Sequence, residues 1–308
     1  MGLARSTLLW ISENKKLRHT LPKLKFIRKA VKRFMPGEKA EDAIRAAQQL
    51  KGASITTILT QLGENISLES DANAVKDHYV NVLDEVQKNG LDAYVSVKLT
   101  QLGLDLNEEL CLRNLSAIAE RANALKNMVW IDIEQSQYVD RTLSIFKSVR
   151  TKYANVGLCL QAYLYRTKTD LEDLLPLSPA IRLVKGAYKE PPSIAFPKKA
   201  DVDANYFMLA TILLQNVKSK GVYAGIATHD LVLHEKIKRE AERLGLSKQD
   251  YEFQMLYGIK MQEQYRLANE GYRMRNLISY GSYWFPWYVR RLAERPANVW
   301  FVVKNTFS

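Results

Sequence analysis

Short apolar runs alternate with longer amphipathic stretches along the chain from residue 37 onward. The amphipathic stretches repeat apolar residues at spacings of three and four, as Ile237, Ala241 and Leu244 do, which predicts helices with one buried face. The apolar runs predict strands at 53–62, 94–101, 128–134, 156–165, 180–188, 222–230, 251–257 and 276–280. Helices are predicted between them at 71–89, 107–125, 138–153, 169–175, 203–219, 231–244 and 260–270.

This order of elements defines the fold class. Strands that alternate with helices predict an α/β fold with a parallel sheet. Eight such units within about 250 residues predict a closed (βα)8 TIM barrel. The alternative is an open doubly wound sheet, which calls for a glycine-rich turn after the first strand. Residues 60–64 contain a single glycine, Gly63, so the barrel is favoured.

Composition excludes several classes of protein. Of 308 residues, 47% are hydrophobic and 25% are charged, as in folded globular proteins. No run of eighteen apolar residues is present, which argues against a spanning helix. Two cysteines, Cys111 and Cys159, and four scattered histidines provide neither a disulfide scaffold nor a zinc site, so no metal is expected. A reducing, cytoplasmic compartment is the expectation.

The net charge of +12 is unevenly distributed. Residues 1–36 contain ten Lys/Arg and one acid, a net charge of +9, which leaves +3 for residues 37–308. Basic residues interleaved with large apolar ones predict an amphipathic helical extension suited to an anionic membrane surface. The alternative is a helical cap that packs on the domain and has a solvated basic face. Because the body is nearly balanced, no nucleic acid is expected, although a basic membrane- or nucleic-acid-binding module is the alternative from a different functional class.

Charged residues cluster at the predicted strand ends. Lys98 ends the second strand, Asp132 the third and Arg182 lies in the fifth. Charges in apolar strands are costly to bury unless they are paired, and the active site of a (βα)8 barrel forms at the carboxyl ends of the strands. Their recurrence at one end of several strands therefore predicts an active site there.

A basic helix is predicted to close the barrel mouth. Pro286 suits its first turn, and the adjacent Arg290 and Arg291 diverge by about 100° around the helix axis. Glu294 is spaced to orient a guanidinium. Together with Lys98, the two arginines would hold one carboxylate if the helix lies across the mouth. The alternative is a solvated basic helix end.

Four motifs carry a family resemblance. They are Arg-Leu-Val-Lys-Gly-Ala-Tyr at 182–188, Ala-Thr-His-Asp at 227–230, Phe-Gln-Met-Leu-Tyr-Gly at 253–258 and Arg-Arg-Leu-Ala-Glu-Arg-Pro-Ala-Asn at 290–298. In this order they resemble proline dehydrogenase of the short monofunctional bacterial type, over residues 37–308. The resemblance implies a distorted barrel that holds FAD and oxidises L-proline to Δ1-pyrroline-5-carboxylate. It implies hydride transfer to the flavin N5 and electron transfer to a membrane quinone. Peripheral contact with the inner face of the membrane is then expected through residues 1–36.

The resemblance also implies a role for individual residues. Asp132 and Arg182 are the implied catalytic residues, Arg182 lying beside the flavin N5 and Asp132 beside Lys98. Lys98, Arg290 and Arg291 are implied to bind the substrate carboxylate, with Glu294 orienting the arginines. The implied cofactor contacts, besides Arg182, are Ile133, Gln161, Lys185, Gly186, Ala187, Thr228 and His229.

One stretch departs from the family. Before the last helix the family reads Arg-Val-Tyr-Val/Leu-Pro-Tyr-Gly, whereas residues 275–281 read Arg-Asn-Leu-Ile-Ser-Tyr-Gly. Leu277 replaces the tyrosine that packs on the substrate ring, and Trp287 replaces a second tyrosine. Loss of the phenol changes the space beside the ring, so trans-4-hydroxy-L-proline or another substituted imino acid is the alternative substrate.

Overall fold

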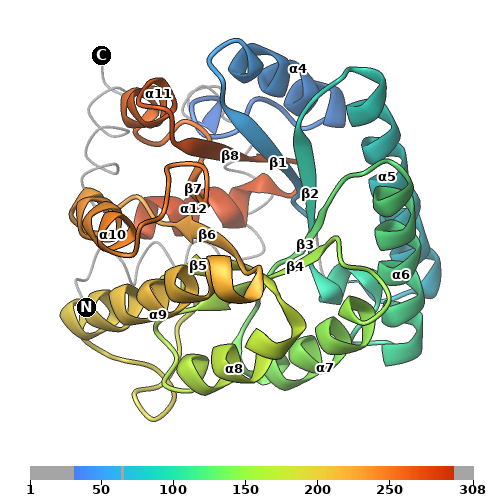
Figure 1. The fold of residues 1–308 in the computed structure, drawn as a ribbon. Coiled ribbons are helices and arrows are strands. Elements are labelled where there is room, and N and C mark those ends of the chain that lie inside the picture. The colour runs from blue at the N-terminus through green and yellow to red at the C-terminus, as the bar shows by residue number, and fades with distance from the viewer. Residues whose placement is uncertain (1–30, 64–65, 295–308) are drawn as a thin grey trace.

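Eight parallel strands close into a single barrel in a computed structural model that describes residues 31–63 and 66–294. The strands follow one another around the barrel in chain order, and β8 pairs with β1 (Figure 1). The predicted (βα)8 barrel is therefore confirmed. The open doubly wound sheet is excluded, because no strand is left at an edge.

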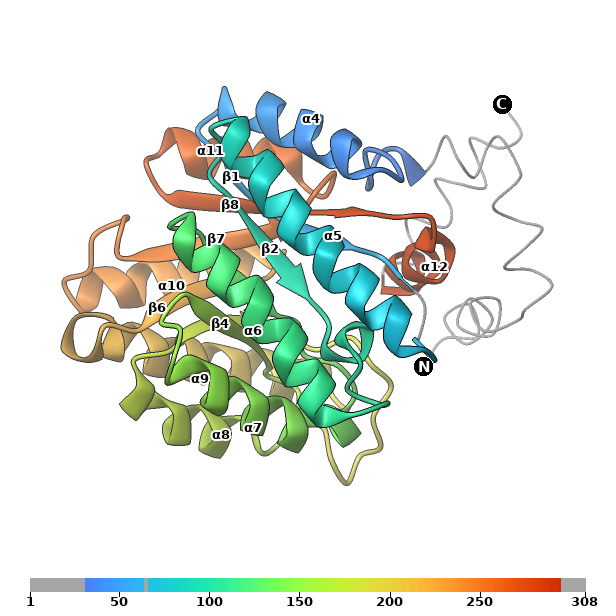
Figure 2. The ribbon, with the colours of Figure 1, turned by 90° about the vertical axis from the view of Figure 1, so that its right-hand side faces the viewer.

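The strands are β1 (Thr56–Gln61), β2 (Ala93–Val97), β3 (Val129–Ile131), β4 (Val156–Gln161), β5 (Ala180–Val184), β6 (Tyr223–Ala227), β7 (Tyr251–Leu256) and β8 (Arg273–Tyr280). The helices are α4 (Ala40–Lys51), α5 (Glu69–Lys88), α6 (Glu108–Ala124), α7 (Val139–Arg150), α8 (Thr167–Leu174), α9 (Lys199–Lys220), α10 (Leu231–Arg243), α11 (Met261–Asn269) and α12 (Trp284–Glu294). Helices α4 to α11 surround the strands, whereas α12 lies at one end of the barrel (Figures 1 and 2).

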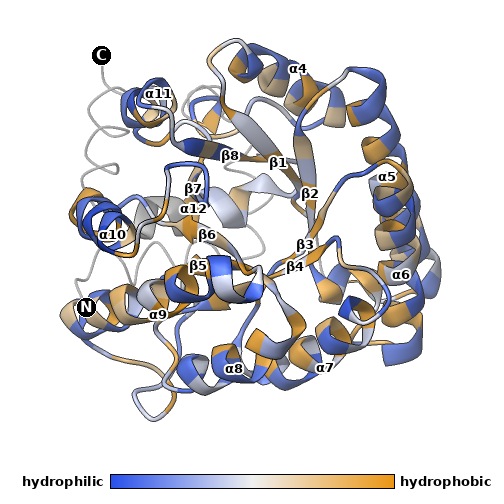
Figure 3. Cartoon of the chain, in the orientation of Figure 1, coloured by the Kyte–Doolittle hydropathy of each residue, from blue (hydrophilic) through white to orange (hydrophobic). Residues whose placement is uncertain are grey.

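Side chains alternate between two apolar layers. On β3, Val129 and Ile131 belong to the core between strands and helices, whereas Trp130 points into the barrel. Inside the barrel, Trp130 packs in a cluster with Ile58, Met128 and Ala180. The helices turn apolar faces toward the strands and polar faces outward (Figure 3). No helix within the described residues is long and apolar enough to cross a membrane.

Two features differ from the predicted elements. Helix α4 was not predicted, although its buried residues lie on one face, because it precedes the first strand and the helices were predicted only between strands. Several strands are shorter than predicted, for instance β5, which ends at Val184 rather than residue 188. The residues beyond these strand ends belong to the loops at the barrel mouth.

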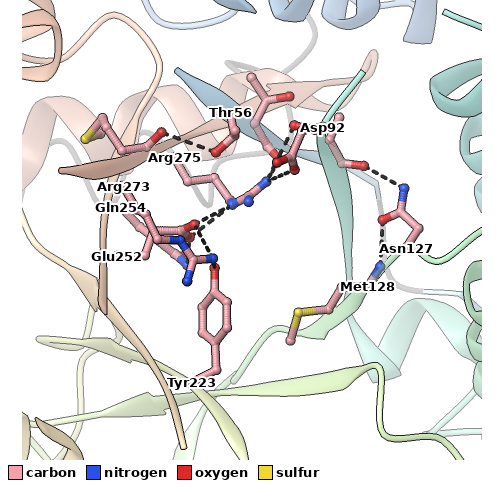
Figure 4. A network of polar contacts seen from close by, with 12 residues as sticks. Thr56, Asp92, Asn127, Met128, Tyr223, Glu252, Gln254, Arg273 and Arg275 are labelled. Carbon is pink, nitrogen blue, oxygen red and sulfur yellow. Dashed lines mark hydrogen bonds and ion pairs between the residues drawn. The ribbon is translucent and has the colours of Figure 1, made fainter. Parts of the chain in front are cut away.

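A buried ion-pair network lies inside the barrel near the starts of the strands (Figure 4). The Arg275 Nε on β8 donates to both carboxylate oxygens of Glu252 on β7, at 3.0 and 2.9 Å. The Arg275 Nη1 also donates to Asp92, at 2.8 Å, and Arg273 donates to the Tyr223 hydroxyl at 3.0 Å. Glu252 and Arg275 are 0% and 2% exposed, so each depends on the other for its charge balance.

We expect Glu252→Gln to lower the free energy of unfolding by about 3 kcal/mol, measured by urea unfolding. Removing one partner of a buried pair costs about 3–5 kcal/mol, and Asp92 still contacts Arg275 in this variant. As a matched control, Glu69→Gln breaks an ion pair with Arg113 whose side chains are more than 60% exposed, so its cost is below about 1 kcal/mol. An equal decrease in the free energy of unfolding in the two variants would show that burial of the Glu252–Arg275 pair does not matter for stability.

Candidate active site

A cavity of about 410 Å³ lies at the carboxyl ends of the strands. This volume is within the range of small-molecule sites, about 300–1,000 Å³. Every predicted site residue whose side chain is described lines it. These residues are Lys98, Asp132, Ile133, Gln161, Arg182, Lys185, Gly186, Ala187, Thr228, His229, Leu277 and Trp287.

Helix α12 contributes Trp287 to the wall of the cavity. Its start is held by the Trp284 indole, which donates to Glu38 at 3.0 Å, and by Val31 and Met35, which pack in the same apolar cluster as Trp284. Three predicted residues, Arg290, Arg291 and Glu294, lie on the following turns of this helix. Their side chains are outside the described part of the structure, so their contribution to a carboxylate clamp stays a prediction.

Asp132 lies between two cations. The Lys98 Nζ donates to its Oδ2 at 2.5 Å, and the Arg182 Nη2 donates to its Oδ1. Burial alone would raise the pKa of Asp132, but Lys98 and Arg182 lower it to about 2. Burial opposes the charge of Lys98, yet Asp132 keeps the pKa of Lys98 above its ordinary value. All three groups are therefore ionised near neutral pH, and together they carry one net positive charge.

Arg182 presents donors to the cavity that the protein leaves unused. Its side chain is 3% exposed, and the guanidinium lies 5.3 Å from the centre of the Trp130 ring. Within the described chain, Nε and Nη1 of Arg182 have no hydrogen-bond partner. Buried donors are almost always satisfied, so two orphaned ones at a cavity fit a bound group that supplies acceptor atoms there, as a flavin ring does.

The backbone after β5 also fits a bound cofactor. Gly186 has a φ of +113°, and a Cβ atom at this position would lie 2.2 Å from the Tyr163 ring. Only glycine permits this turn, which brings the backbone of residues 186 and 187 to the cavity wall. The preceding Lys185 is held by Asp203 at 2.5 Å and by Asp230 at 2.7 Å.

Hydrogen bonds fix two further side chains on the wall. The Leu256 backbone N–H donates to the His229 Nε2 at 3.0 Å, so a neutral imidazole carries its proton on Nδ1. The Gln161 Nε2 donates to the Glu134 carbonyl oxygen at 2.9 Å. The His229 imidazole and the Gln161 amide are therefore both oriented by hydrogen bonds within the protein.

Several residues on the wall were not among the predicted ones. Tyr188 and Gln254 lie within the recognised motifs, so the motifs could have found them. Thr60, Cys159 and Ser279 also line the cavity, and no pattern in the sequence distinguishes them from other strand residues. A larger hollow of about 580 Å³ lies outside the barrel between α4 and α11, and no carboxylate is among its described lining residues.

The fold and the cavity define the class of protein as a (βα)8-barrel enzyme with a cationic site at the strand ends. The family model described as proline dehydrogenase matches residues 43–304. The chain belongs to the proline dehydrogenase family, and it is accordingly an FAD-dependent oxidoreductase.

Individual proteins support this assignment. The chain is 37% identical over 303 residues to proline dehydrogenase 1 of Bacillus subtilis subsp. natto, covering 98% of this chain and 99% of that protein. It is 39% identical over 278 residues to proline dehydrogenase of Deinococcus radiodurans, covering 89% and 88%. Proline utilization A (PutA) of Bdellovibrio bacteriovorus, solved after inactivation by N-propargylglycine, shares the fold with a TM-score of 0.82 at 23% identity. That match covers 94% of this chain but only 38% of the PutA chain.

The shared carboxylate predicts a pH-dependent stability. The pKa of Asp132 is about 2 in the folded protein, below its ordinary value of 3.8, so its stabilising contribution is present above about pH 4 and is lost as the pH falls through 2. We expect Asp132→Asn to be less stable than the wild type at pH 6, because it leaves Lys98 and Arg182 unpaired. The difference in the free energy of unfolding between the wild type and Asp132→Asn should narrow by about 2 kcal/mol as the pH falls to 2, measured by urea unfolding.

Asp173→Asn on α8 is the control, because it removes the same charge from an exposed side chain. Its stability relative to the wild type should change little over this pH range. A difference between wild type and Asp132→Asn that stays constant with pH would contradict the electrostatic role of Asp132.

Proposed function

We propose that this protein oxidises L-proline to Δ1-pyrroline-5-carboxylate in the cavity at the barrel mouth. The observation that carries the proposal is the group formed by Lys98, Asp132 and Arg182, which places one net positive charge on the wall of a cavity in a member of this family. An imino acid presents one carboxylate to such a site, and FAD when bound accepts the hydride from its ring carbon.

Lys98 supplies the first contact for the substrate carboxylate. Its ammonium is held on one side by Asp132 and is about one quarter exposed to the cavity. Arg290 and Arg291 complete the clamp in this proposal, with Glu294 orienting them, because a carboxylate accepts paired N–H bonds from guanidinium groups. Leu277 and Trp287 provide the apolar walls against which the imino-acid ring is held in position.

The cofactor contacts follow from the same wall. Arg182 offers its Nε and Nη1 donors, and His229 contributes its imidazole to the same wall. Backbone of Gly186 and Ala187 lies at the cavity and permits close approach of a phosphate or a ribityl chain. Ile133, Gln161, Lys185 and Thr228 complete the proposed set. Asp132 acts by holding the two cations charged and in place, since its low pKa leaves no proton to donate near neutral pH.

We expect anaerobic addition of L-proline to bleach the flavin absorbance of the purified protein. Lys98→Met should need at least tenfold more proline for the same bleaching, because the carboxylate loses a charged hydrogen-bond donor. The control is Lys236→Met on the exposed surface of α10, which removes the same charge away from the cavity. A flavin that proline does not reduce in the wild type would contradict the proposed function.

Trans-4-hydroxy-L-proline is the second candidate substrate. Leu277 lines the cavity where the family carries a ring-packing tyrosine, and Ser279 adds a hydroxyl to the same wall two residues later on β8. When the same flavin bleaching is followed over time, Leu277→Tyr should lower the rate of bleaching by hydroxyproline relative to the rate with proline. A strong preference of the wild type for unsubstituted proline would rule this candidate out.

We also propose that the electrons pass to a membrane quinone and that residues 1–36 bring the barrel to the membrane. The net charge of +9 in this segment supports the proposal, as does the position of Val31 and Met35 beside α12, which reaches the cavity. The alternative is that the whole segment is a cap on the barrel. Both possibilities are compatible with the described residues of this segment, Val31 and Met35, which pack beside α12.

Flotation with anionic liposomes separates these two possibilities. The triple variant Lys15→Glu, Lys16→Glu, Arg18→Glu should bind at least tenfold less than the wild type, with weaker wild-type binding at high salt. The control makes the same charge change on α10, at the exposed Lys236, Arg239 and Arg243. If the extension variant and the control float equally with the wild type, residues 1–36 do not dock the protein.

A further inference from the structure

We infer that Ser96 is a positioning residue, whose hydroxyl group orients the Arg182 guanidinium so that two of its nitrogen donors face the cofactor. The inference rests on the proposed flavin site and assigns it a residue that does not line the cavity. Ser96 lies on β2 and is 0% exposed, so it cannot itself contact a ligand in the cavity.

The Ser96 hydroxyl links the two opposite charges. Its oxygen accepts a hydrogen bond from the Arg182 Nη2 at 3.0 Å, and it donates its own hydrogen to the Asp132 Oδ1 at 2.7 Å. A serine hydroxyl has one hydrogen and two lone pairs, so it makes both bonds at once without conflict. The same Asp132 oxygen accepts from Arg182, which closes a three-membered set of contacts.

These contacts fix which guanidinium atoms remain available. Nη2 is occupied by Ser96 and Asp132, and the Trp130 ring covers one face of the group. Nε and Nη1 are left without a partner in the described chain, and these are the donors assigned above to the cofactor. Asp132 alone would not define this orientation, because its other oxygen is committed to Lys98.

Ser96 is itself held by the barrel wall. The Tyr79 hydroxyl on α5 donates to the Ser96 carbonyl oxygen at 2.8 Å and accepts from the Gln61 N–H at 2.9 Å. The Ser96 backbone is thus linked to α5 and β1 through the Tyr79 hydroxyl, in addition to its pairing with Thr60 in the sheet. A hydroxyl mounted on such a rigid element sets the geometry of a site more precisely than one on a loop.

The test compares Ser96→Ala, Ser96→Thr and the wild type as flavin-loaded proteins. Loss of the hydroxyl leaves Nη2 short of a partner and frees the guanidinium to turn, and hydrogen bonds to charged groups affect equilibria by about tenfold or more. We expect Ser96→Ala to shift the two-electron potential of the bound flavin by about 30 mV to more negative values, equivalent to tenfold. We expect kcat for proline to fall about tenfold with KM changed less than threefold, and Ser96→Thr to recover most of both.

Thr57→Val on β1 is the matched control. It removes another buried hydroxyl from the barrel wall, one that makes no hydrogen bond within the described chain, and it should leave the flavin potential unchanged. Flavin content and melting temperature are measured for every variant. A Ser96→Ala protein with reduced melting temperature but wild-type potential would show a purely structural role and overturn the inference. Ser96→Thr as impaired as Ser96→Ala, at wild-type melting temperature, would also overturn it.

The potential is measured without proline, which separates the inference from the proposed function. A wild-type protein whose flavin is not reduced by proline would contradict that function, while the shift in potential still decides the role of Ser96.

Discussion

The active-site end of the barrel depends on one carboxylate that serves two cations. Asp132 gives one oxygen to Lys98 and the other to Arg182, and all three residues line the cavity. Burial makes each of these charges costly unless an opposite charge lies close to it, and Asp132 meets that need for both. With the shared anion both stay charged, and the three groups together keep one net positive charge, which in the proposed function would attract an anionic substrate and stabilise a reduced ring.

Strand order makes this sharing possible. Lys98 follows β2, Asp132 follows β3 and Arg182 lies on β5, so residues far apart in sequence meet because parallel strands deliver their carboxyl ends to one rim. The loop after β5 adds a backbone turn that only glycine allows at position 186, and α12 adds Trp287 to the cavity wall. The cavity is therefore assembled from strand ends and the loops that follow them, with α12 contributing Trp287.

The sequence predicted the parts of this arrangement that leave a periodic or motif signal. The eight alternating units predicted the barrel, and the motifs predicted that Arg182, Gly186 and His229 would meet in one cavity, which they do. Helix α4 was missed because it precedes the first strand, outside the alternation from which the helices were predicted. Ser96 was missed because a single serine in an apolar strand carries no pattern, and only its neighbours in space reveal its contacts.

The interior of the barrel meets the cost of buried charge in two different ways. Near the strand starts, Arg273 and Arg275 are matched by Glu252 and Asp92, so two positive charges face two negative ones. At the mouth, the ion pairs that Lys98 and Arg182 make within residues 31–63 and 66–294 both go to Asp132. Glu134 acts on Lys98 electrostatically without an ion pair, and two Arg182 donors have no hydrogen-bond partner in the same part of the chain. A network that only stabilises the fold has no reason to leave charge and donors unmatched. The unmatched guanidinium donors therefore set the cluster at the mouth apart from the cluster at the strand starts.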